Sequence, residues 1–308
     1  MTKIFAFLGQ GPRPRYFAGN GNPAKLSDEE LRQDAFEAVR DLIQNTGLNL
    51  IKKSYGQGIH GDSGFMHPLP TKVPHHILTL LTIAADGAGI ATGGLGAWAS
   101  TAALAQLRLL YESYALVAWL LDGDEDEQRE RGYALTHDAI DLLRRDGTHW
   151  EELAKHHPSA RALAERYAAA AKTMKQDIDA LAASNGTTLG KKPQCKIIMN
   201  QYAPDLGAYP AFAALSNAGA HPSALQPVLF YGDTTTGAFV FDFDGKNVER
   251  AYWLTQCGEC FRKLLDLAAT PLGWSDWPSA SAQWKSVIDS LRAEAERRYE
   301  AVKGTQAL

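Results

Sequence analysis

Cysteine is scarce in this sequence: the 308-residue chain contains three, at positions 195, 257 and 260. That number is too small for the disulfide framework of a small secreted domain, and an odd number favours a reducing compartment.

An excess of positive charge is also lacking, because the net charge is −4. A protein whose whole surface follows a phosphate backbone needs such an excess. RNA could therefore be contacted only through a local basic patch.

Long uninterrupted apolar runs are missing as well. The richest one, from Ile77 to Trp98, is broken by Asp86 and five glycines, whereas a membrane helix needs about 20 predominantly apolar residues. The short apolar run at the N-terminus is followed by Gly, Pro and Arg where a signal-peptide cleavage site would lie. We therefore expect no membrane span and no signal peptide, and we predict a cytoplasmic protein.

The residues that are present predict an all-α fold. Hydrophobic residues make up 45% of the chain and charged residues 21%, which are ordinary globular proportions. Apolar residues recur at helical spacing, and residues typical of helix starts and stops mark several ends, such as Ser27 and Asn185-Gly186. The expected helices cover residues 28–45, 75–86, 97–121, 124–145, 158–184, 206–218, 248–269 and 281–302.

One segment changes to the alternating pattern of strands. Residues 228–231 and 238–241 flank Gly232-Asp233-Thr234, which predicts a small β-hairpin within residues 228–243. The expected fold class is therefore an all-α multi-helix bundle with this one hairpin. Residues 1–26 read as an irregular N-terminal arm, and residues 27–308 as a single helical domain.

Three motifs suggest cofactor or metal chemistry, and each has an ordinary structural interpretation. In the Gly-rich stretch 86–96, Thr92 occupies the place of the third glycine of a dinucleotide loop, so no cofactor is expected. Cys257 and Cys260 have the spacing of a redox dithiol or half a zinc site, but no second pair exists. We expect reduced, metal-free thiols. Histidines are concentrated at positions 60, 67, 75 and 76. They lack the Glu-x-x-His pattern of di-iron bundles, so we predict no metal site.

Arg131 and His137 are separated by five residues on one expected helix. This spacing resembles the ribonuclease motif of the HEPN (higher eukaryotes and prokaryotes nucleotide-binding) superfamily. The resemblance implies an all-helical fold and a metal-independent ribonuclease of a defence or stress system. His137 would then be the acid/base and Arg131 would hold the phosphate.

A second resemblance rests on the helix around Arg108 and Glu112, continued by Trp119-Leu120-Leu121-Asp122, and on the segment from Ser216 to His221-Pro222. These residues are similar to an uncharacterised family of helical proteins that is common in actinobacteria. The family implies a helical fold and supplies no established activity. Because a charged pair on a largely apolar helix needs partners, we predict that Arg108, Glu112 and His221 converge inside the bundle.

Two functional hypotheses therefore stand. In the first, the protein binds a small polar or anionic ligand in a pocket between helices, with Arg108 as the anchor. In the second, it is a HEPN-like ribonuclease that uses Arg131 and His137. A closed pocket around Arg108 would favour the first, and a basic rim around Arg131 would favour the second. A homodimer is compatible with either, and the sequence leaves open whether the protein is an enzyme.

Overall fold

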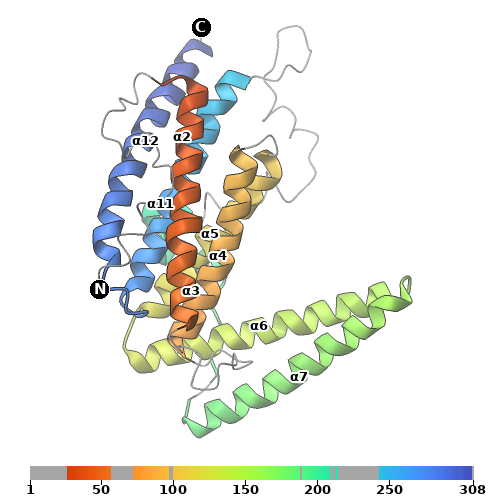
Figure 1. The fold of residues 1–308 in the computed structure, drawn as a ribbon. Helices are drawn as coiled ribbons and strands as arrows, with labels where there is room; N and C mark the ends of the chain where they lie inside the picture. The colour runs from red at the N-terminus through yellow and green to blue at the C-terminus, as the bar shows by residue number, and fades with distance from the viewer. Residues whose placement is uncertain are drawn as a thin grey trace. The chain divides into compact units, whose positions relative to one another are not determined.

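The computed structural model describes residues 26–56, 72–96, 100–187, 189–208, 210, 213 and 243–306. This part of the chain is 88% helical and contains no strand (Figure 1), so the predicted all-α class is confirmed. The predicted hairpin lies outside the described residues except for Phe243, where a helix begins. The helix expected over residues 206–218 also lies mostly outside them.

Helix α2 (Asp28–Asp41) begins at a capping box in which Ser27 and Glu30 each accept a hydrogen bond from the other's amide. The chain continues through a π-helical segment, η3 (Leu42–Gly47), into α3 (Leu48–Gly56). The sequence predicted an end near residue 45, and the packing of Gly47 explains the difference. A Cβ atom there would lie 2.5 Å from Cε1 of Phe261. Glycine therefore lets this fully buried ring pack directly against the helical backbone.

Helix α4 (Val73–Gly96) runs without a break through the Gly-rich stretch, so the prediction that residues 87–96 interrupt it is wrong. At Gly87, a Cβ atom would lie 3.1 Å from the carbonyl oxygen of Gln106 and 3.2 Å from Cβ of Leu109. Both belong to α5 (Ser100–Leu121). The glycine allows α4 and α5 to approach closely, which offsets its low helix propensity.

Helix α6 (Glu125–Ala154) likewise passes through Asp146-Gly147, where the sequence predicted its end. Gly147 is buried, and a Cβ atom on it would lie 3.5 Å from Cβ of Tyr167. Packing against α7 (Arg161–Ser184) thus outweighs the stop signal. The predicted range 158–184 is confirmed by a 3-10 turn, η4 (Pro158–Ala160), and α7 together.

The remaining elements are α8 (Cys195–Tyr202), η5 (Pro204–Leu206), α11 (Phe243–Ala269) and α12 (Trp277–Gln306). The last two confirm the helices predicted over 248–269 and 281–302, with longer ends. Helix α8 was not predicted, because its 8 residues offer little more than two turns of pattern.

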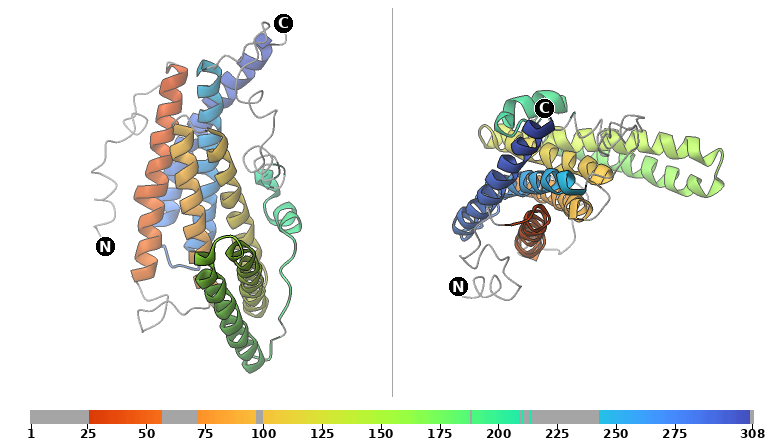
Figure 2. Two further views of the ribbon diagram at one scale, coloured as in Figure 1. Left: turned by 90° about the vertical axis from the view of Figure 1, so that its right-hand side faces the viewer. Right: turned by 90° about the horizontal axis from the view of Figure 1, so that it is seen from above.

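The chain divides into two compact units. In unit 1, α11 packs between α2 and α12 (Figures 1 and 2), with Leu254, Phe261 and Leu265 fully buried. In unit 2, α6 packs along α7 around Tyr133, Ile140, Ala171 and Ile178. Helices α4 and α5 run through both units, and one domain from residue 27 onward stays a prediction. Unit 1 is Met1–Lys53, Leu80–Val117 and Met199–Leu308; unit 2 is Ser54–Thr79 and Ala118–Ile198.

Helix α4 is long and apolar enough to cross a membrane, and 50% of its most apolar window is buried inside the protein. A core helix of a soluble protein has the same properties. Two of its glycines pack against other helices of unit 1: Gly87 against Leu109 of α5 and Gly96 against Phe36 of α2. The predicted absence of a membrane span and the predicted cytoplasmic location stay predictions.

Candidate functional site

The predicted ligand site is only partly described. Arg108 and Glu112 are half-buried on α5. Within the described ranges, neither side chain forms a hydrogen bond or an ion pair. Ser216 and His221 lie outside the described residues. The convergence of this group, and with it a ligand site anchored by Arg108, stays a prediction.

Arg131, the phosphate-binding residue of the nuclease hypothesis, caps the end of α5. Its Nη1 donates to the carbonyl oxygens of Trp119 and Asp122, each at 2.5 Å. Its guanidinium lies 5.8 Å from the centroid of the Trp119 ring. Since the last carbonyls of a helix have no intrahelical donor, this contact satisfies them. To hold a phosphate, Arg131 would have to leave this cap.

His137, the proposed acid/base of the same hypothesis, lies one turn from Asp141 on α6. The Nδ1 atom is 3.8 Å from the Asp141 carboxylate, and both side chains are partly exposed. Nothing in this pair requires a nuclease, because a histidine and an aspartate four residues apart often meet on a helix surface. The catalytic roles of Arg131 and His137 stay predictions.

The two cysteines of α11 are buried thiols. Cys257 and Cys260 are both 0% exposed and free. Burial raises the pKa of Cys257 to about 12 and raises that of Cys260 well above its usual value. The Sγ atom of Cys257 is 3.8 Å from the hydroxyl of Thr92 on α4. Because the thiolate is the reactive and metal-binding form, these residues act as small core side chains.

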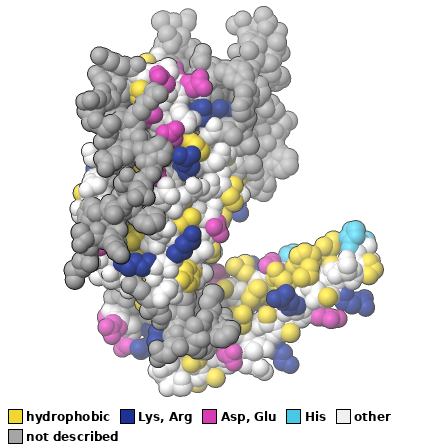
Figure 3. All heavy atoms as spheres, viewed as in Figure 1, with side chains coloured by type: hydrophobic (Ala, Val, Ile, Leu, Met, Phe, Trp, Pro, Cys, Tyr) yellow, Lys and Arg dark blue, Asp and Glu magenta, His cyan; other side chains and the backbone are white. Residues whose placement is uncertain are grey.

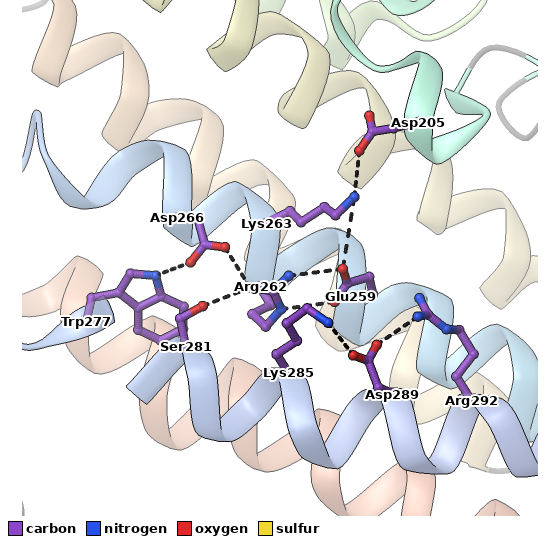
Figure 4. Close-up of polar contacts among 10 residues, drawn as sticks. All are labelled: Asp205, Glu259, Arg262, Lys263, Asp266, Trp277, Ser281, Lys285, Asp289 and Arg292. Carbon is purple, nitrogen blue, oxygen red and sulfur yellow. Dashed lines mark hydrogen bonds and ion pairs between the residues drawn. The ribbon is translucent and has the colours of Figure 1, made fainter. Parts of the chain in front are cut away.

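A buried polar network joins α11 to α12 next to these cysteines (Figure 4). Arg262 donates two hydrogen bonds to Glu259, at 2.9 and 3.0 Å, and further bonds to Asp266 at 2.6 Å and to Ser281 at 2.8 Å. Asp266 also accepts from the indole of Trp277 at 2.7 Å. Burial by itself lowers the pKa of Arg262, but these carboxylates outweigh it and raise the pKa.

Every charge in this network has a partner, so the network has no unused binding capacity for a ligand. Arg262 and Glu259 are each 5% exposed. Removing one member of such a buried pair leaves the other uncompensated, which typically costs about 3–5 kcal/mol. The network fixes the register of α11 on α12, and we do not assign it to the functional site.

A different pair of arginines in unit 1 lacks such partners. Arg32 on α2 donates from Nη1 to the carbonyl oxygen of Gly96, the last residue of α4, at 2.5 Å. Arg250 lies on the first turns of α11. The Nε atoms of both arginines are buried and have no hydrogen-bond partner. Across the described part of the chain, neither guanidinium forms an ion pair with a carboxylate.

The two positive charges are close enough to influence each other. Burial lowers the pKa of Arg250, and the charge of Arg32 lowers it further. Glu249, its neighbour in the sequence, acts in the opposite direction without outweighing them. Asp28, an acidic residue in the first turn of α2, is already paired with Arg298 of α12. We call Arg32 and Arg250 the arginine pair.

An aromatic side chain borders the arginine pair. Phe36 follows Arg32 by one turn of α2, and Gly96 is packed on its ring: a Cβ atom on this glycine would lie 2.5 Å from Cδ2 of Phe36. The guanidinium of Arg40 lies 5.2 Å from the centroid of the same ring. Arg32 therefore contacts the last residue of α4, and Arg40 contacts the ring on which that residue packs.

The arginine pair was not predicted from the sequence. Arg32 and Arg250 lie on expected helices, but in the sequence both residues look like the ordinary solvated charges of helix surfaces. The useful signal would have been an arginine without a carboxylate neighbour, and that depends on which helices meet. Positions 32 and 250 are brought together only by the packing of α2 on α11.

Comparisons with family models, with curated proteins and with solved structures find no match to this chain. The resemblances to the actinobacterial helical family and to HEPN proteins therefore stay predictions.

Proposed function

We propose that the protein binds a small anionic ligand, with a phosphate or carboxylate group held between Arg32 and Arg250. The observation that carries the proposal is that, among the described residues, both guanidiniums have a buried Nε without a partner and neither forms an ion pair with a carboxylate. Leaving such groups unpaired costs free energy. A bound oxyanion would provide both the missing acceptors and the missing negative charge.

The chemistry of arginine favours this class of ligand. The planar guanidinium donates two parallel hydrogen bonds to a carboxylate or phosphate, and it keeps its charge when partly buried. Arg40 would add positive charge at one side, next to the ring of Phe36. This proposal keeps the ligand class expected from the sequence and replaces Arg108 by the arginine pair as the anchor. The HEPN-like alternative has less support, because Arg131 is engaged in the cap of α5.

Thermal unfolding with added anions tests the proposal. Wild-type protein is titrated with pyrophosphate, inorganic phosphate or citrate at constant ionic strength. A ligand at about 100 times its Kd stabilises the folded state by about 2.7 kcal/mol, which corresponds to a rise in Tm of about 5 °C for a chain of this size. We expect at least one of these anions to produce such a rise.

The matched variants separate a site from a general salt effect. Arg250→Met replaces the aliphatic stem of the side chain but removes the guanidinium and its charge, and it should abolish the anion-dependent rise. Without anions, this variant should be as stable as the wild type or more stable, because an unbalanced charge is lost. Arg292→Met removes an arginine that pairs with Asp289, and it should retain the rise. The proposal is wrong if no anion raises the Tm, or if Arg250→Met responds like the wild type.

A further inference from the structure

Helices α6 and α7 form an antiparallel two-helix hairpin with a regular seam. Their inward positions repeat at alternating spacings of three and four residues, as in a coiled coil. Gly147 faces Tyr167, whose ring also contacts Trp150 at a centroid distance of 6.4 Å. At the other end, Asn185 donates to the hydroxyl of Tyr133 at 2.8 Å. The seam consists of residues 133, 136, 140, 143, 147, 150 and 154 of α6 and residues 164, 167, 171, 174, 178, 181 and 185 at α7.

One face of this hairpin carries apolar side chains that the seam does not use. Leu142, Leu153 and Leu163 are 49%, 40% and 38% exposed. When the seam positions of each helix are taken as positions a and d of a heptad, Leu142 and Leu153 lie on the same side of α6. Because the two helices are antiparallel, the side of α7 that bears Leu163 lies next to it. Figure 3 shows hydrophobic side chains gathered in a strip along this hairpin. We call this surface the leucine face.

The leucine face also carries acidic and basic side chains without ion-pair partners among the described residues. Asp146 on α6 and Arg166 on α7 occupy flank positions between the leucines in the same heptad frame. Both are exposed, and neither forms a hydrogen bond or an ion pair with any described residue. Such a surface, with unpaired charges of both signs, can pair Asp146 with Arg166 of a second copy of itself when the two copies are related by a two-fold axis.

The size of the face matches what a stable dimer needs. Helix α7 has 24 residues, so at 1.5 Å per residue the face is about 36 Å long, and two helices of about 10 Å diameter make it about 20 Å wide. It therefore offers about 700 Å² per copy, close to the roughly 800 Å² per partner of a standard protein interface.

We propose that the leucine face is a homodimer interface, in which two α6–α7 hairpins pack into a four-helix bundle. The leucines of the two copies bury one another at the centre. Asp146 of each subunit pairs with Arg166 of the partner subunit, which sets the register. The seam contains small residues such as Gly147 and Ala171, so the two helices alone bury little apolar surface. A second copy would cover the leucines that remain exposed.

Sedimentation velocity of the full-length protein over a range of concentrations tests this proposal. We expect a reversible monomer–dimer equilibrium in the wild type. Leu153→Glu buries a charge in the interface and should weaken the dimer by more than about tenfold in Kd. Ala169→Glu places the same charge on the outward side of α7 and should leave the dimer unchanged. Circular dichroism verifies that both variants keep the helical content of the wild type.

A charge exchange identifies the register. Asp146→Arg and Arg166→Asp should each weaken the dimer through repulsion of like charges, and the double variant should restore it. A protein that stays monomeric at all concentrations overturns the proposal. A dimer that Leu153→Glu leaves intact, or that the double variant does not restore, also overturns it, since the subunits would then associate through another surface or in another register.

Discussion

Individual arginines of unit 1 differ in how their charge is balanced, and this difference separates structural from functional roles. Arg262 and Arg298 each have two carboxylate partners, and both link α12 to another helix. Arg32 and Arg250 have none among the described residues. A balanced buried charge fixes the packing of helices, whereas an unbalanced one retains the capacity to bind an anion. The proposed function follows from this contrast.

Another residue with an unsatisfied polar atom is His76, in unit 2. It is 5% exposed, its Nε2 has no hydrogen-bond partner, and a Cβ atom on Gly132 of α6 would lie 3.1 Å from that nitrogen. Burial, and to a smaller extent the charge of His75, lowers the pKa of His76 from 6.5 to about 4. The neutral imidazole therefore packs on α6 near neutral pH.

This pKa makes the protein less stable in mild acid. As the pH falls from 6.5 toward 4, the unfolded chain takes up a proton at His76 that the folded protein does not. Stability is full above the unfolded pKa, and about 3 kcal/mol is lost across this window. Urea unfolding at about pH 7.5 and about pH 5 should differ by roughly 2 kcal/mol more in the wild type than in His76→Gln.

The control for His76 is the exposed histidine at position 149 of α6. His149→Gln should keep the pH dependence of the wild type. If His76→Gln also keeps it, His76 does not have the lowered pKa, and a different group causes the loss of stability in acid.

At the scale of single elements, the glycines of α4 and α6 explain where the sequence analysis was wrong. It treated glycine as a stop signal, which is correct for Gly186, whose φ is +62°. Gly87 and Gly147 are instead helical residues at which another helix comes close. The residue type is the same in both cases. Whether a glycine ends a helix or lets another helix pack on it depends on the neighbouring helix, which no single stretch of sequence contains.

Two glycines of α4, two residues apart, test this explanation. Gly89 has nothing within 4 Å of a Cβ position, whereas a Cβ atom on Gly87 would lie 3.1 Å from a backbone oxygen of α5. Gly89→Ala should stabilise the protein by about 0.5–1 kcal/mol through helix propensity. Gly87→Ala should lose that gain and destabilise the protein by about 1–3 kcal/mol, because α4 and α5 must separate.

Urea unfolding of the two glycine variants measures this difference directly. Far-UV circular dichroism shows whether both variants keep the helical content of the wild type. Equal stabilisation by both substitutions would mean that α4 and α5 do not pack closely at Gly87.

At the scale of the whole molecule, the two units differ in how their helices are supported. Helix α11 packs on both α2 and α12, while the main packing partner of α7 is α6. Local opening is easier where fewer apolar contacts hold a helix. At low protein concentration, amide hydrogen exchange measured by mass spectrometry should therefore be faster in peptides of α7 than in peptides from the middle of α11.

The proposed dimer adds a condition to this prediction. Raising the protein concentration should slow exchange in α6 and α7 and leave α11 unchanged, since only the hairpin would gain contacts. Equal protection of α7 and α11 at low concentration would contradict the assumption that α6 alone supports α7.

The sequence by itself determined the helical class, the absence of an excess of positive charge and most helix positions, because these depend on composition, capping residues and local periodicity. Capping at Ser27 and the stop at Asn185-Gly186 are local hydrogen-bonding and backbone preferences, so a short window contains them. Only the tertiary structure decided which glycines continue a helix and which arginines lack a counterion. Those properties belong to pairs of residues such as Arg32 and Arg250, more than two hundred positions apart in the chain, and are set by which helices pack together.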